Sequence, residues 1–149
     1  MLFGCLALGG ILAGAAYTDI ASRRIPNRLI VAGLCAFLLL ACRLCLRQEM
    51  RLLAGCVKAG ALAFATHLPL YQRKVMGAGD VKLALVVGLL LGWQHWLGYL
   101  YAFSAAALVV SGILLCRGNK KTKTLPMAPL MLAAYLIYMF TGLVRFSGI

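Results

Sequence analysis

Long apolar runs separated by short basic loops are the feature that most limits what this chain can fold into. The runs are about 17 to 20 residues long; apolar residues make up 64% of the sequence and charged residues 12%. A helix that crosses a hydrocarbon core about 30 Å thick needs about 20 such residues. In lipid every backbone N–H and C=O group needs a hydrogen-bond partner, so only helices and closed β-barrels span a membrane. Apolar runs of this length predict helices. We expect an all-α, polytopic membrane helical bundle, a single membrane-embedded domain over residues 1–149.

The runs predict about six transmembrane helices, over residues 2–18, 29–46, 52–71, 81–91, 97–116 and 125–144. As one helix, residues 81–116 would be about 54 Å long, too long for a single crossing. We therefore expect a break within Gly92-Trp93-Gln94-His95-Trp96, since paired tryptophans are typical of the membrane interface. The first run has no basic segment before it, so a cleaved signal peptide is not expected.

The positive charges predict the orientation of the chain. The net charge of +12 lies mostly in loops and not on one amphipathic face, so we expect no nucleic-acid partner. Four basic residues fall on one side of the predicted bundle, and ten fall on the other, in the first, third and fifth loops: Arg23, Arg24, Arg28, Arg73, Lys74, Lys82, Arg117, Lys120, Lys121 and Lys123. The positive-inside rule then places these loops in the cytoplasm and both termini on the non-cytoplasmic side.

Cysteines and glycines in the apolar runs are interpreted as packing residues. All six cysteines lie inside apolar segments, where thiols usually behave as small hydrophobic side chains. Cys42 and Cys45 form a Cys-x-x-Cys with no second pair to complete a zinc site, so we expect no metal, no disulfide and no cofactor. Glycines four residues apart, at 10 and 14 and at 88 and 92, predict close helix packing.

Only three residues of the chain are acidic: Asp19, Glu49 and Asp80. Asp19 and Asp80 each lie where an apolar run meets a basic loop, and the predicted topology puts both on the cytoplasmic side. A carboxylate costs about 2.5 to 3.5 kcal/mol at the centre of a membrane helix, so its presence beside a span indicates a function. Two partly desolvated carboxylates close together would share one proton, the arrangement of an aspartyl protease. Gly77 and Gly79 allow backbone angles closed to other residues and, without side chains, let a substrate backbone approach Asp80 closely.

Two motifs resemble the type IV prepilin peptidases, which are GxGD intramembrane aspartyl proteases. They are Gly77-Ala78-Gly79-Asp80-Val81-Lys82-Leu83 and Asp19-Ile20-Ala21-Ser22-Arg23-Arg24-Ile25-Pro26-Asn27. The stretch Leu125-Pro126-Met127-Ala128-Pro129-Leu130 is similar to the start of that family's last span. The resemblance covers nearly the whole chain, and the chain looks most like the short Tad/Flp pilus enzymes.

The resemblance implies a membrane-embedded aspartyl endopeptidase in a bacterial or archaeal plasma membrane. Asp19 and Asp80 would be its catalytic pair, with Gly77, Gly79 and Lys82 positioning the substrate. That substrate would be a prepilin-like or pseudopilin-like protein, cut after its leader at the cytoplasmic interface of the bilayer. The family's bifunctional members carry an N-terminal segment with paired Cys-x-x-Cys motifs, which this sequence does not show. Methyltransferase activity is therefore not expected.

Simpler interpretations remain open for each of these residues. Asp80 could cap a helix, and Asp19 could pair with Arg23 or Arg24. Lys82 could be a membrane anchor, and His67 could be a packing residue or could reach the aspartates. For the whole chain, the alternatives are a small proton-coupled or ion-coupled transporter that uses Asp19 and Asp80, and a non-catalytic membrane assembly subunit.

Overall fold

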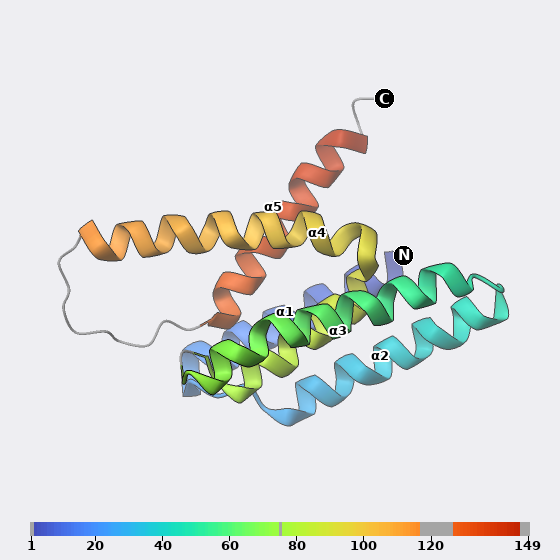
Figure 1. Ribbon diagram of the computed structural model, residues 1–149, viewed down its shortest axis with the longest axis horizontal. Helices are drawn as coiled ribbons and strands as arrows, with labels where there is room; N and C mark the ends of the chain where they lie inside the picture. Colours follow the sequence, from blue (N-terminus) through green and yellow to red (C-terminus); the bar gives the residue numbers. More distant parts are fainter. Residues whose placement is uncertain (1, 75, 117–126, 147–149) are drawn as a thin grey trace.

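Five helices make up the protein in the computed structural model, which describes residues 2–74, 76–116 and 127–146 (Figure 1). Within these residues all regular secondary structure is helical, so the all-α prediction is confirmed. The helices are α1 (Leu2–Ser22), α2 (Asn27–Leu46), α3 (Met50–Gln72), α4 (Ala78–Cys116) and α5 (Met127–Phe146). Leu125 and Pro126, in the predicted last span, lie outside the described residues.

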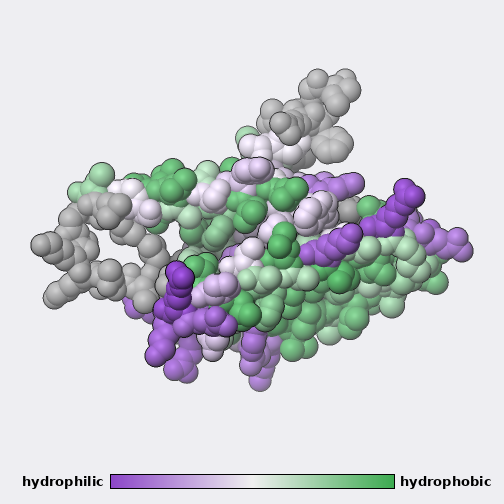
Figure 2. All heavy atoms as spheres, in the orientation of Figure 1, coloured by the Kyte–Doolittle hydropathy of each residue, from purple (hydrophilic) through white to green (hydrophobic). Residues whose placement is uncertain are grey.

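Four of these helices are long and apolar enough to cross a membrane: α1, α2, α3 and α4. The apolar part of α5, Met127–Gly142, is shorter. Large apolar side chains such as Leu39, Leu46 and Phe140 are exposed, as expected for surfaces that face lipid. Figure 2 shows hydrophilic residues gathered toward the two ends of the bundle, with a hydrophobic band between them. The chain is a multi-pass membrane protein.

The break predicted near the two tryptophans occurs at Gly92. Its backbone angles, φ 71° and ψ 170°, are not helical, and they divide α4 into residues 78–91 and 93–116. A positive φ carries little penalty for glycine because it has no Cβ. In Figure 1 the first part of α4 lies within the bundle, and the second part turns sharply and runs back across it. The break predicted within residues 92–96 is thus confirmed.

Helix α3 packs chiefly against α4, in an antiparallel register set by small residues. A Cβ added to Gly88 would lie 2.6 Å from the Ala59 carbonyl oxygen, and one added to Gly60 would lie 2.6 Å from Leu89 Cδ2. Side chains larger than hydrogen would therefore push these helices apart. Gly55 lies opposite Trp93 further along the same interface. In this register the end of α3, at residue 72, lies near the start of α4, at residue 78. The start of α3, at residue 50, lies near the break in α4, at residue 92.

Helix α5 is held against α1 and α4 by apolar packing and two hydrogen bonds. Leu8, Leu12 and Met131 are fully buried in the shared core. The Tyr135 hydroxyl donates to the Cys5 carbonyl oxygen over 2.7 Å. Tyr138 Oη and His95 Nδ1 are 2.7 Å apart and hydrogen-bonded. These contacts bring the first turn of α5 beside the last turn of α1.

Candidate functional site

Asp19 lies in the last turn of α1. Of the charged residues that the structure describes, it is the one that is buried, with 7% of its surface exposed. A helix C-terminus is an unfavourable place for a carboxylate, because the helix dipole is negative there. Asp19 instead faces the start of another helix: its Oδ2 accepts a hydrogen bond of 3.1 Å from the Ala128 backbone N–H, in the first turn of α5. A helix N-terminus offers free N–H groups and a positive dipole end, which compensate a buried carboxylate. This is the tertiary contact that holds Asp19 in place.

Asp80 lies in the first turn of α4 and is half-buried. Its Oδ2 accepts a hydrogen bond of 3.1 Å from the Gly77 backbone N–H, while the Asp80 N–H donates to the Gly77 carbonyl oxygen at 3.2 Å. The carboxylate therefore reaches back to the residue before the helix, as the third residue of a capping box does. The helix-capping interpretation is correct in part, because this bond uses one carboxylate oxygen. The other oxygen forms no hydrogen bond with the described residues.

Both carboxylates line one pocket of about 290 Å³, here called the aspartate pocket. Its lining residues are Asp19, Arg23, Arg24, Ile25, Gly77, Ala78, Gly79 and Asp80. They come from the end of α1, the loop after it and the start of α4. Arg23 adopts a left-handed conformation, with φ 51°, and its N–H donates to the Asp19 carbonyl oxygen at 2.9 Å. That residue ends α1 and turns the chain so that Arg24 and Ile25 lie over the pocket.

Gly77 and Gly79 line the pocket in backbone conformations that other residues can also adopt. Neither has a positive φ, and of the described glycines only Gly92 does. Their missing side chains matter for a different reason. A Cβ on Gly79 would lie 3.1 Å from Ile25 Cβ, and one on Gly77 would lie 3.2 Å from Asp80 Oδ2. The two glycines allow the α1–α2 loop and the Asp80 carboxylate to approach the chain closely.

Lys82 and His67 lie outside the aspartate pocket. Two residues along a helix correspond to a rotation of about 200°, so Lys82 is directed away from Asp80, and it is exposed. His67 Nδ1 is 2.7 Å from the Ala63 carbonyl oxygen, and its ring lies near Phe103, with centroids 6.4 Å apart. Because a carbonyl only accepts, Nδ1 carries the proton in this contact. His67 thus packs against the second part of α4.

Three features of the site had no signal in the sequence: the Ala128 N–H that anchors Asp19, the packing of Ile25 on Gly79, and the place of both arginines in the pocket wall. An ion pair of Asp19 with Arg23 or Arg24 was only the alternative left open by the sequence. In the described part of the chain, however, the hydrogen bond to Asp19 comes from Ala128. No group of three or more His, Cys, Asp or Glu that could hold a metal ion occurs among the residues with assigned positions.

The model of the type IV leader peptidase family matches residues 6–116 of the chain. The match includes both aspartates and all the residues of the aspartate pocket, and it ends before α5. No curated protein matches the chain, and no solved structure does.

Proposed function

The chain belongs to the type IV leader peptidase family, and from this premise we propose that it is an aspartyl endopeptidase embedded in a bacterial or archaeal plasma membrane. Its substrate is a prepilin-like or pseudopilin-like protein of a pilus or secretion system, and its product is that protein without its leader peptide. Asp19 and Asp80 are the catalytic pair. Gly77 and Gly79 allow the substrate backbone to approach, whereas Lys82 is exposed and outside the residues that line the aspartate pocket, which does not support a positioning role for it.

One observation carries this proposal: Asp19 and Asp80, 61 residues apart in sequence, line the same pocket. Each is anchored through Oδ2 to a backbone N–H, from Ala128 and from Gly77 respectively. One oxygen of each carboxylate is thereby fixed, and the other is left for water or substrate. Such anchoring holds both groups in place before the substrate binds.

The chemistry that follows needs only this pair and a water molecule. One carboxylate, ionised, takes a proton from the water, whose oxygen attacks the scissile carbonyl carbon. The other, protonated, donates a hydrogen bond to the carbonyl oxygen as negative charge develops there. The tetrahedral intermediate then collapses, the peptide C–N bond breaks, and the leaving amine receives a proton. No covalent enzyme intermediate is formed.

The proposed orientation in the membrane is supported by the distribution of basic residues between the loops and by the break in α4. The two parts of α4, divided at Gly92, cross the bilayer separately, which gives six spans together with α1, α2, α3 and α5. Both termini are non-cytoplasmic, and the aspartate pocket opens near the cytoplasmic surface. A substrate with its leader in the cytoplasm and its apolar helix in the bilayer would present the cleavage site at that depth.

The direct test replaces each acid of the chain in turn and measures cleavage of a co-expressed prepilin from the same genome. We expect Asp19→Asn and Asp80→Asn each to lower cleavage by at least about 100-fold, because general acid–base groups contribute about that much or more. Glu49→Gln is the matched control: it removes the remaining acid of the chain, which is exposed and outside the pocket. N-terminal sequencing of the product identifies the cleavage site.

Full activity of either asparagine variant at normal protein level would show that the aspartyl mechanism is wrong. Loss of activity in Glu49→Gln to the same degree would show that the assay responds to any lost acid. An assembly subunit without catalysis would tolerate all three changes. An ion-coupled transporter would instead show Asp80-dependent proton uptake in reconstituted vesicles.

A further inference from the structure

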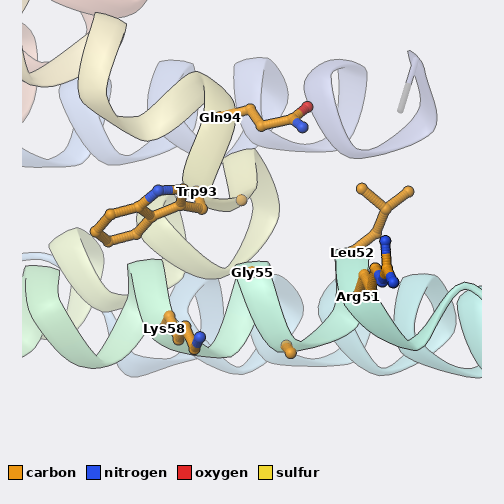
Figure 3. Close-up of a pocket in the computed structure, with 8 residues that line it drawn as sticks. Arg51, Leu52, Gly55, Lys58, Trp93 and Gln94 are labelled. Atoms are coloured by element: carbon orange, nitrogen blue, oxygen red, sulfur yellow. The ribbon is translucent and has the colours of Figure 1, made fainter.

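A larger pocket, of about 590 Å³, lies where α4 breaks, and we call it the α4-break pocket. It is lined by Arg51, Leu52, Ala54, Gly55, Lys58, Gly92, Trp93 and Gln94. Figure 3 shows these side chains on two facing segments: Trp93 and Gln94 come from the α4 break, while Arg51, Leu52 and Lys58 come from α3. In the antiparallel register of α3 and α4, this pocket is at the end of the pair opposite Asp80.

The pocket is positively charged, and its charges are placed by helix geometry. Arg51, Gly55 and Lys58 are spaced i, i+4 and i+7 along α3, so they share one face. The two cations are separated by about 10 Å along the axis, with a glycine between them. No acidic residue lines this pocket. An uncompensated pair of cations next to apolar surface favours an anionic ligand.

The break in α4 is what opens this space. A continuous helix would carry residues 93 and 94 onward along α3, but Gly92 turns the chain away and leaves the face of α3 uncovered there. Gly55 brings the two segments together at the base of the pocket, since a Cβ at that position would lie 3.5 Å from Trp93 Cβ. The Gln94 amide, which is exposed, adds hydrogen-bonding capacity at the rim.

The surroundings of the pocket indicate what kind of anion it takes. Lys58 lies about 12 Å along α3 from Met50, so its amine reaches toward the interface from within the apolar length of the helix. Trp93 is 42% exposed and has the amphipathic character of residues at the headgroup level. Leu52 and Ala54 form an apolar part of the pocket wall, which a free anion would not contact favourably. A phosphate attached to acyl chains would pair with the two cations through its charge and pack against the apolar wall through its chains.

We propose that the α4-break pocket binds the phosphate of an anionic phospholipid, with Arg51 and Lys58 as its cationic partners. Basic pockets between membrane helices are suited to such headgroups. The acyl chains lie along the exposed apolar surface beside the pocket, and the bound lipid fills the space left by the break. It thereby stabilises the angle between the two parts of α4. This site is separate from the aspartate pocket and does not depend on the proposed peptidase function.

The test measures thermal unfolding of the full chain in a non-ionic detergent while phosphatidylglycerol is added. Parallel titrations use phosphatidylcholine and inorganic phosphate at equal phosphorus concentration. We expect the unfolding midpoint to rise with phosphatidylglycerol and not with either of the others, because ligands that bind only the folded state raise stability. The double variant Arg51→Gln/Lys58→Gln should bind phosphatidylglycerol at least about tenfold more weakly, the loss of about 1.4 kcal/mol of binding free energy.

Two matched variants make the result specific. Arg43→Gln/Arg47→Gln removes the same charge from the end of α2, outside the pocket, and should keep the wild-type response. Arg51→Lys/Lys58→Arg keeps both charges and should also keep the wild-type response to phosphatidylglycerol. The proposal fails if phosphatidylcholine stabilises equally, if inorganic phosphate alone reproduces the effect, or if Arg51→Gln/Lys58→Gln responds as the wild type does.

Discussion

Asp19 has two tasks in the structure, and they can be separated by substitution. Its carboxylate lines the aspartate pocket, and its Oδ2 also accepts the hydrogen bond that fixes the start of α5. Asp80 differs, because its bond to Gly77 is local to the first turn of its own helix. Changes at Asp19 should therefore affect the packing of α5, while changes at Asp80 should affect the loop before α4.

Asp19→Ala should lose both activity and stability, whereas Asp19→Asn should lose activity alone. Alanine leaves the Ala128 N–H without its partner, which costs about 1 to 3 kcal/mol of folding free energy in a buried site. Asparagine still offers a carbonyl oxygen at the same place. Thermal unfolding in detergent, measured beside prepilin cleavage, distinguishes the two variants. Equal unfolding midpoints for Asp19→Ala and the wild type would mean that the contact with Ala128 contributes nothing to stability.

At the scale of helices, the pair α3 and α4 depends on glycine at two kinds of position. Gly88 and Gly60 lie in the interface and allow backbones to approach. Gly92 supplies a backbone conformation that ends one helical segment and begins another. Sequence spacing alone suggested one role for both Gly88 and Gly92, because a four-residue interval does not distinguish packing from a break.

Gly88→Ala should destabilise the protein, although alanine is the better helix former. The added Cβ would lie 2.6 Å from the Ala59 carbonyl oxygen, and a backbone atom cannot move aside as a flexible side chain can. Overpacking of this kind costs about 1 to 3 kcal/mol, more than the gain of up to about 1 kcal/mol in helix propensity.

Gly112→Ala is the control on the same helix, because a Cβ there meets nothing within 4 Å. It should leave the unfolding midpoint unchanged or raise it. If Gly88→Ala also proved neutral, the close approach of α3 and α4 at that point would be wrong.

At the scale of the whole molecule, the proposed topology can be tested by reporter fusions. Alkaline phosphatase, which is active only outside the cytoplasm, should be active when fused after the C-terminus, since six crossings return the chain to the non-cytoplasmic side. The same reporter fused after Arg73, in the loop between α3 and α4, should be inactive because that loop is rich in positive charge. The reverse pattern would place the aspartate pocket on the wrong side for a leader in the cytoplasm.

The sequence by itself determined the properties that depend on local composition. Run length and hydropathy specify helices that cross a membrane, and residues 92–96 marked the break in α4 because the run is longer than the bilayer is thick. The positions of Asp19 and Asp80 beside basic loops identified them as the acids of interest. Each of these inferences needs only neighbouring residues and the dimensions of a bilayer.

Tertiary structure alone decided which distant groups meet. The Ala128 N–H is 109 residues from Asp19, and its contact with the carboxylate depends on how α5 packs against α1. Likewise Arg23 and Arg24, just after the end of α1, share the wall of one pocket with Gly77 and Asp80, at the start of α4. Contacts of this kind arise from packing between helices, and packing depends on the shapes of both surfaces at once, which no single stretch of sequence contains.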